Sequence, residues 1–201
     1  QRDMFSKPHF LSPLDSQTPN DAANALVASA RTALQCITRA EVFGSGSNPG
    51  HVNALTIVGA GRAPNEPMLL RNRQHQPHLL LDISIEYTVA YLPDETMQQP
   101  YRATIANYAY AIQDLSGSET FAYHWHPTGV SHVKTPHMHF NGSTPVRLPK
   151  RPGNPDERVL SLRRAHFPTR RIELAAFIRF LIRDLDVEPR RPDWEQVLIE
   201  N

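Results

Sequence analysis

The chain has 201 residues, of which 40% are hydrophobic and 20% are charged, and its formal net charge is +1 at pH 7. This composition is ordinary for a globular protein, and the length fits one domain with a full hydrophobic core. The single cysteine, Cys36, excludes an internal disulfide framework and a cysteine-rich zinc site. The sequence has no run of about 18 apolar residues and no visible signal peptide, so we expect a cytoplasmic protein without a membrane partner.

Charge is distributed unevenly along the chain. Residues 1–133 carry 8 Lys and Arg against 11 Asp and Glu, whereas residues 134–191 carry 13 against 6, which are net charges of −3 and +7. A basic segment of this kind suits a phosphate-bearing partner such as RNA. The alternative is that its arginines coat the solvent face of a helix.

The first predicted element is a helix that follows an N-terminal arm. Residues 1–17 have no hydrophobic period and are expected to form an extended arm, leaving residues 18–201 as a single α+β domain. Thr18 is the expected N-cap of the helix, and Gly44 is expected to end it. Residues 59–78 are rich in Gly, Pro, Asn, Gln and Arg, and we expect them to be a long irregular connection.

Strict alternation then predicts an antiparallel meander. Residues 79–91 and 101–114 each alternate apolar with polar or small side chains, which is typical of strands with one buried face. Folding the chain at Ser116-Gly117 pairs Tyr110 with Tyr123 and, on the opposite face, Ala109 with His124. The aromatic face is expected to be the core.

Four histidines occupy matched positions on the last two predicted strands. The first strand contains Tyr123-His124-Trp125-His126-Pro127 and the second contains Pro136-His137-Met138-His139-Phe140. Residues two apart share a face of a strand, so antiparallel pairing that aligns the apolar residues also gathers the four imidazoles. Asp82 and Glu86 share this face two strands away, at roughly 10 Å, and no carboxylate adjoins the histidine motifs.

The clearest helix follows His166-Phe167-Pro168-Thr169, and Thr169 is its expected N-cap. Its apolar stripe comprises Leu174, Phe177, Ile178, Leu181, Ile182 and Leu185. The predicted fold class is therefore α+β: an antiparallel meander sheet with an N-terminal and a C-terminal helix packed on one face and the histidine cluster on the other.

One interpretation of the cluster is a metal site. Imidazole is a common ligand of zinc and iron, so His124, His126, His137 and His139 are candidate ligands of one Zn, Fe or Mn ion, with Asp82 or Glu86 as a further ligand. Such a site serves a hydrolase, or an enzyme of cupin-like chemistry acting on a small molecule.

A second interpretation is metal-free cleavage of RNA. Two of the same histidines would act as general base and general acid. Lys134, Arg147 and Arg163 would stabilise charge on the phosphate, and His132 lies on the loop between the two strands. A third interpretation is a non-catalytic domain whose sheet face binds a protein, with the histidines as ordinary half-exposed residues.

The order of these elements resembles small bacterial toxin components of toxin–antitoxin modules, in which a Tyr/Trp-rich strand precedes a Pro-His-His-type strand and a C-terminal helix. The resemblance covers about residues 120–185 and rests on Tyr123, Trp125, Pro136, His137 and His139. It implies an RNA-directed or otherwise growth-inhibiting activity and an antitoxin partner. On this basis the expected function is a histidine-cluster hydrolase of the nuclease type.

Overall fold

The computed structural model describes residues 15–92, 100–130, 132–141, 146–148, 158–160 and 165–200; of residues 15, 146–148 and 158–160 it describes the backbone. The fold is α+β, as the alternation predicted. Its helices are α1 (Pro19–Leu34), α2 (Leu174–Asp184) and α3 (Trp194–Glu200). Its strands are β1 (Asp15–Ser16), β2 (Ala40–Gly44), β3 (Val52–Gly59), β4 (Met68–Arg71), β5 (Pro77–Tyr91), β6 (Tyr101–Gln113), β7 (Glu119–Trp125), β8 (His137–Phe140), β9 (Val146–Leu148), β10 (Arg158–Leu160) and β11 (Phe167–Pro168).

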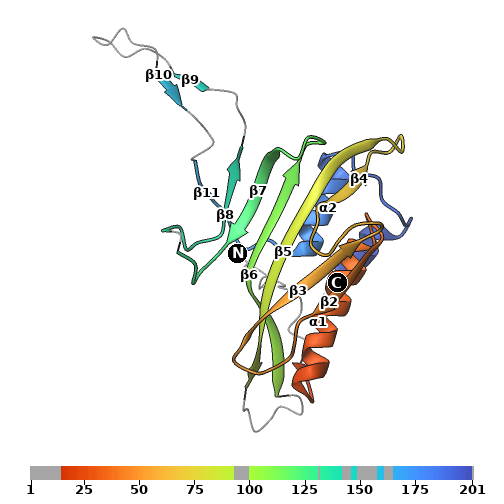
Figure 1. The fold of residues 1–201 in the computed structure, drawn as a ribbon, viewed down its shortest axis with the longest axis vertical. Coiled ribbons are helices and arrows are strands. Elements are labelled where there is room, and N and C mark those ends of the chain that lie inside the picture. Colours follow the sequence, from red (N-terminus) through yellow and green to blue (C-terminus); the bar gives the residue numbers. More distant parts are fainter. Residues whose placement is uncertain are drawn as a thin grey trace, which may run out of the picture.

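Nine of the described strands form one sheet, and its main path runs β11-β8-β7-β6-β5-β3-β2. The pairings along this path are antiparallel, and β5 and β6 are the long central strands. Strand β4 pairs with β5, and β1 pairs with the start of β6. Strands β11 and β2 are the two ends of the path and therefore lie at opposite edges of the sheet (Figure 1).

The aromatic face of the sheet is the core. Tyr110 is fully buried, and its ring stacks 5.2 Å from the ring of Phe177 in α2. Tyr123 meets the same Phe177 edge-on at 5.8 Å, so α2 covers the aromatic side chains of both β6 and β7. Helix α1 contributes Leu26, Ala30 and other buried apolar residues to the same core cluster. None of the helices in the described ranges is long and apolar enough to cross a membrane.

The ends of the helices differ in part from the sequence prediction. Thr18 is the N-cap of α1, and its side chain accepts a hydrogen bond from the Asp21 N–H. The helix ends at Leu34, however, well before Gly44, which instead ends β2. Residues 59–78 are not wholly irregular either, because they contain β4. Residues 1–14 of the predicted arm lie outside the described part, and Asp15 and Ser16 pair with β6.

The predicted start of the C-terminal helix at Thr169 is also wrong. The Thr169 N–H donates to the carbonyl of Pro136, which continues the pairing of β11 with β8. The chain is therefore held extended there, and helix α2 begins only after Glu173, the N-cap residue.

We expect Phe177→Ala to lower the free energy of unfolding by about 3–5 kcal/mol, because it removes a buried ring that packs on Tyr110 and Tyr123. Urea denaturation followed by circular dichroism measures the change. Phe43→Ala is the matched control, since 52% of Phe43 is exposed, and it should cost far less. Equal losses in the two variants would contradict this description of the core.

Candidate functional site

The register of three strands brings the four predicted histidines to one face of the sheet. His124 pairs with His137 across β7 and β8, and Ala122 pairs with His139. On the other side of β7, Ala109 of β6 pairs with His124, as the alternation predicted. Since partners across a strand pair project to the same face, the imidazoles lie together on the face opposite the aromatic core.

His124 lies at the centre of this histidine cluster. Its ring centroid is 4.6 Å from that of His139, 5.3 Å from that of His126 and 5.9 Å from that of His137. The centroids of His137 and His139 are 6.3 Å apart. His137 is only 4% exposed, so the cluster is partly buried within the sheet face.

A fifth histidine, His166, joins the cluster. Its ring centroid is 4.8 Å from that of His137 and 6.0 Å from that of His139. It is placed there by the residue that follows it, because Phe167 of β11 pairs with Met138 of β8. Strand β11 has two residues, which are too few to show a hydrophobic period. The alternation pattern could therefore not reveal that β11 pairs with β8.

A carboxylate also adjoins the cluster, contrary to the expectation from the motifs. Strict alternation places Glu119 on the aromatic face with Phe121. However, the register between β6 and β7 shifts at this point: Ile112 faces Phe121, while Gln113 faces Glu119. This bulge turns Glu119 to the histidine face, where its Oε1 lies 3.3 Å from the Nδ1 of His139.

Three of the imidazoles share one hydrogen-bonding arrangement. The Nδ1 of His137 donates to the carbonyl of Thr135 at 2.9 Å, and the Nδ1 of His139 faces Glu119. The Nδ1 of His124 lies 3.2 Å from the Nε2 of His126. In each ring Nδ1 is therefore engaged, and within the described part of the chain Nε2 has no hydrogen-bond partner. For His124 that Nε2 atom is also buried.

The environment of the cluster favours the neutral form of three of its imidazoles. Burial, together with the nearby His139, His126, His137 and His166, lowers the pKa of His124 to about 4. Burial and the nearby His137 lower the pKa of His126, whereas the charge of Glu86 acts to raise it. Burial also lowers the pKa of His139, and Glu119 partly offsets this effect. Neutral imidazole is the form that binds metals and accepts protons.

The two carboxylates expected from β5 are placed unequally. Asp82 pairs with Ala111, and that alanine and Ala122 separate it from His139. Burial raises the pKa of Asp82. Glu86 accepts a hydrogen bond from the side-chain amide of Asn107, and its charge reaches His126. Of the two, Glu86 is therefore the one that acts on the cluster.

Of the expected phosphate-binding residues, the structure describes the side chains of Lys134 and His132. Lys134 is exposed and donates to the carbonyl of Gly129 on its own loop, and His132 is exposed on the same loop. The structure describes only the backbone of Arg147, in β9, and Arg163 lies outside the described residues. Within the described residues, no group of three or more His, Cys, Asp or Glu side chains is already disposed to hold a metal ion.

Comparison with known proteins assigns no function to the site, so its interpretation rests on the geometry. The chain matched no protein-family model, no curated protein and no solved structure. The class of site defined by the described residues is a partly buried cluster of imidazoles with the carboxylate of Glu119 beside it.

We expect acid to destabilise the metal-free protein, kept so with EDTA, between about pH 6.5 and pH 4. His124, His126 and His139 have lowered pKa values in the folded chain, so the unfolded chain, whose imidazoles titrate near 6.5, binds more protons in this window. The free energy of unfolding is therefore retained above this window and falls as the pH falls through it.

Urea titrations at about pH 7.5 and about pH 5 measure this loss. His124→Asn should reduce the difference in unfolding free energy between the two pH values, since it removes the group with the largest shift. His132→Asn, in the exposed loop, should keep the wild-type difference. The same difference in all three proteins would contradict the assignment of the lowered pKa values to the cluster.

Proposed function

We propose that the protein is a hydrolase of the nuclease type, in which the histidine cluster binds one divalent transition metal and cleaves phosphodiester bonds in RNA. The observation that carries this proposal is the shared arrangement of His124, His137 and His139. Each Nδ1 has a partner and each Nε2 has none among the described residues. Metal-binding histidines characteristically donate the second ring N–H to a carbonyl or a carboxylate, which fixes the ring and leaves the other nitrogen for the metal.

The spacing of the rings supports the same proposal. Two imidazoles bound to one zinc ion through nitrogens at about 2.0–2.1 Å have ring centroids about 5 Å apart in tetrahedral geometry. The centroids in the cluster are separated by 4.6–6.3 Å. The side chains are not already disposed around one point, so binding requires small rotations of the imidazoles about their side-chain bonds. The strands that carry them need not move.

Each residue of the cluster then has a distinct role. His124, His137 and His139 hold the metal through Nε2, and three ligands leave a position open, as catalytic sites require. Glu119 orients His139, and His126 orients His124. When bound, the metal lowers the pKa of a water molecule and so supplies hydroxide near neutral pH. His166 is exposed beside His137, and in this proposal it gives a proton to the leaving oxygen.

RNA is the proposed substrate for two reasons. The segment that contains β8, β11 and α2 belongs to residues 134–191, whose net charge is +7, and such a segment attracts a polyanion. The resemblance to toxin components of toxin–antitoxin modules points to RNA as well. It also adds a protein antitoxin as the proposed partner.

Metal-free cleavage of RNA is the second candidate, and the contact between His124 and His126 favours it. Two imidazole nitrogens 3.2 Å apart can pass a proton between them. The lowered pKa values of both rings suit a general base but not a general acid. This candidate therefore needs a different acid, for which His166 is the nearest exposed imidazole.

We expect the freshly purified, untagged protein to contain about one equivalent of zinc, iron or manganese by elemental analysis. His137→Ala/His139→Ala should lose the metal and the cleavage of a fluorescent RNA, because two of three ligands are gone. His132→Ala is the control and should retain both, since this histidine lies on the exposed loop.

Two outcomes would separate the candidates. Cleavage that survives exhaustive chelation, with less than a tenth of an equivalent of metal left, would refute the metal centre and favour the metal-free route. Stoichiometric metal without cleavage of any RNA would refute the nuclease. It would point instead to a metal enzyme acting on a small molecule.

Glu119→Gln should weaken metal binding by about 10- to 100-fold, because the carboxylate that orients His139 and increases its basicity is lost. Competition with a chromophoric chelator measures the dissociation constant. Glu41→Gln is the control. Glu41 is exposed, it interacts with Arg31, and it lies in β2 at the edge of the sheet remote from the cluster. An unchanged dissociation constant in Glu119→Gln would contradict the role proposed for the bulge.

A further inference from the structure

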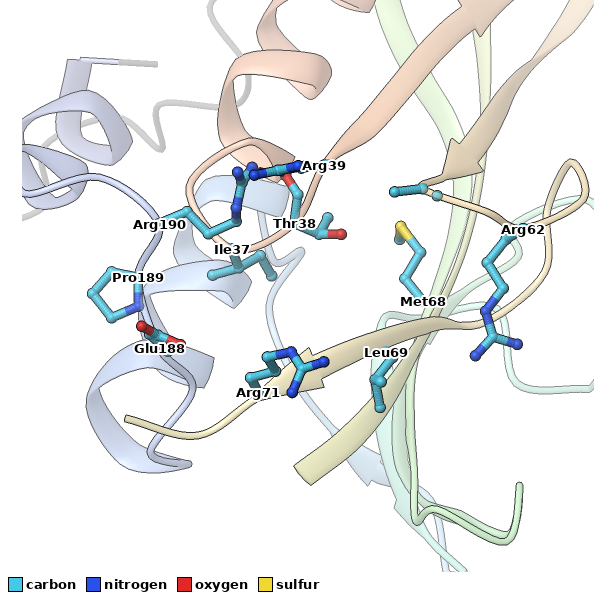
Figure 2. A pocket seen from close by; sticks show the side chains of 12 residues that line it. Ile37, Thr38, Arg39, Arg62, Met68, Leu69, Arg71, Glu188, Pro189 and Arg190 are labelled. Atoms are coloured by element: carbon cyan, nitrogen blue, oxygen red, sulfur yellow. Dashed lines mark hydrogen bonds between the residues drawn. The ribbon is translucent and has the colours of Figure 1, made fainter. Parts of the chain in front are cut away.

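A cavity lined by arginines lies at the side of the sheet remote from the histidine cluster. Its volume is about 610 Å³. It is lined by the connection between α1 and β2, the end of β3 with the turn that follows, strand β4, and the segment between α2 and α3, and it is open to solvent. We call it the arginine pocket, and Figure 2 shows four arginine side chains around it. They are Arg39, Arg62, Arg71 and Arg190.

The positive charge of the arginine pocket is largely uncompensated. Among the described residues, Arg39 and Arg62 have no acidic partner. Arg71 donates to a backbone carbonyl, that of His75, at 2.6 Å. Glu188 is the one carboxylate in the lining, and its Oε1 lies 2.7 Å from the Nδ1 of His75. Four arginines thus line a space whose lining includes one carboxylate.

The hydroxyl of Thr38 also faces the arginine pocket. Thr38 is only 8% exposed as a residue, and its hydroxyl points into the cavity in Figure 2. From there it can donate a hydrogen bond to an acceptor oxygen of a ligand in the cavity. The apolar side chains of Ile37, Met68 and Leu69 form the rest of the wall.

Backbone hydrogen bonds hold the walls of the arginine pocket in place without a ligand. The N–H of Arg190 donates to the carbonyl of Cys36 at 2.7 Å, and its guanidinium donates to the carbonyl of Thr38 at 3.2 Å. The N–H of Glu188 donates to the carbonyl of Arg71 at 2.8 Å. Three segments distant in sequence are thereby joined, so a ligand meets a largely formed site.

We propose that the arginine pocket binds a phosphorylated small molecule of nucleotide size. Its volume lies within the range of about 300–1,000 Å³ that is usual for small-molecule sites. Guanidinium groups match phosphate oxygens in geometry as well as in charge. The mixed lining fits a ligand with two parts: phosphates against the arginines, and an apolar ring system against Met68 and Leu69.

Isothermal titration calorimetry with ADP, and with adenosine as the uncharged comparison, tests the proposal. ADP should bind saturably and more weakly as salt is raised, and adenosine should bind at least tenfold more weakly. Arg39→Gln/Arg62→Gln should weaken ADP binding at least tenfold, because two guanidiniums without acidic partners are lost. Arg170→Gln is the matched control, since it removes an exposed arginine outside the lining and should leave binding unchanged.

Thermal unfolding of the double variant should match that of the wild-type protein, because both arginines are exposed. Thr38→Val gives a second test and should weaken ADP binding while adenosine binding is unaffected. Equal affinity for ADP in wild-type protein and in Arg39→Gln/Arg62→Gln would overturn the proposal. The proposal would also be overturned if ADP failed to saturate the protein while a short RNA bound to it in a way that depended on the two arginines.

The arginine pocket is independent of the proposed nuclease function. Strands β5, β6 and β7 separate it from β8 and β11 in the sheet. His137→Ala/His139→Ala should therefore bind ADP as the wild-type protein does. Loss of metal in that variant with ADP binding intact would support two separate sites, whereas joint loss would overturn the assignment of the nucleotide to the arginine pocket.

Discussion

The pairing register of β6, β7 and β8 is the constraint on which the rest of the structure depends. Successive residues of a strand face opposite sides, so a slip by one residue would move the histidines into the core and the aromatic residues out of it. The packing of Tyr110 and Tyr123 against Phe177 opposes that slip. The core thereby fixes the register, and the register assembles the histidine cluster on the other face.

The histidine cluster costs free energy of folding, but it gathers side chains that are suited to chemistry. His124 is held neutral by burial and by its neighbours, and its buried Nε2 has no partner in the described part of the chain. Apolar residues at these positions would avoid that cost. A bound cation would be coordinated by the free nitrogens of His124, His137 and His139 together. The proposed metal site would therefore account for this unfavourable arrangement.

The helices and the histidines lie on different faces of the sheet. Both α1 and α2 contribute to the core on the aromatic side, whereas the paired His124 and His137 project to the opposite face. The arginine pocket uses the other edge, where the ends of α1 and α2 approach β4. The two sites differ in chemistry, because one gathers neutral imidazoles and the other gathers cationic guanidiniums.

The sequence by itself determined the meander, the pairing of Ala109 with His124 and the gathering of four histidines, because all of these follow from a period of two along each strand. The tertiary structure decided what no local period contains. A bulge turned Glu119 to the histidine face, and the pairing of β11 with β8 added His166 and delayed the start of α2. The arginine pocket likewise joins Thr38, Arg62 and Arg190, which backbone hydrogen bonds between distant segments bring together.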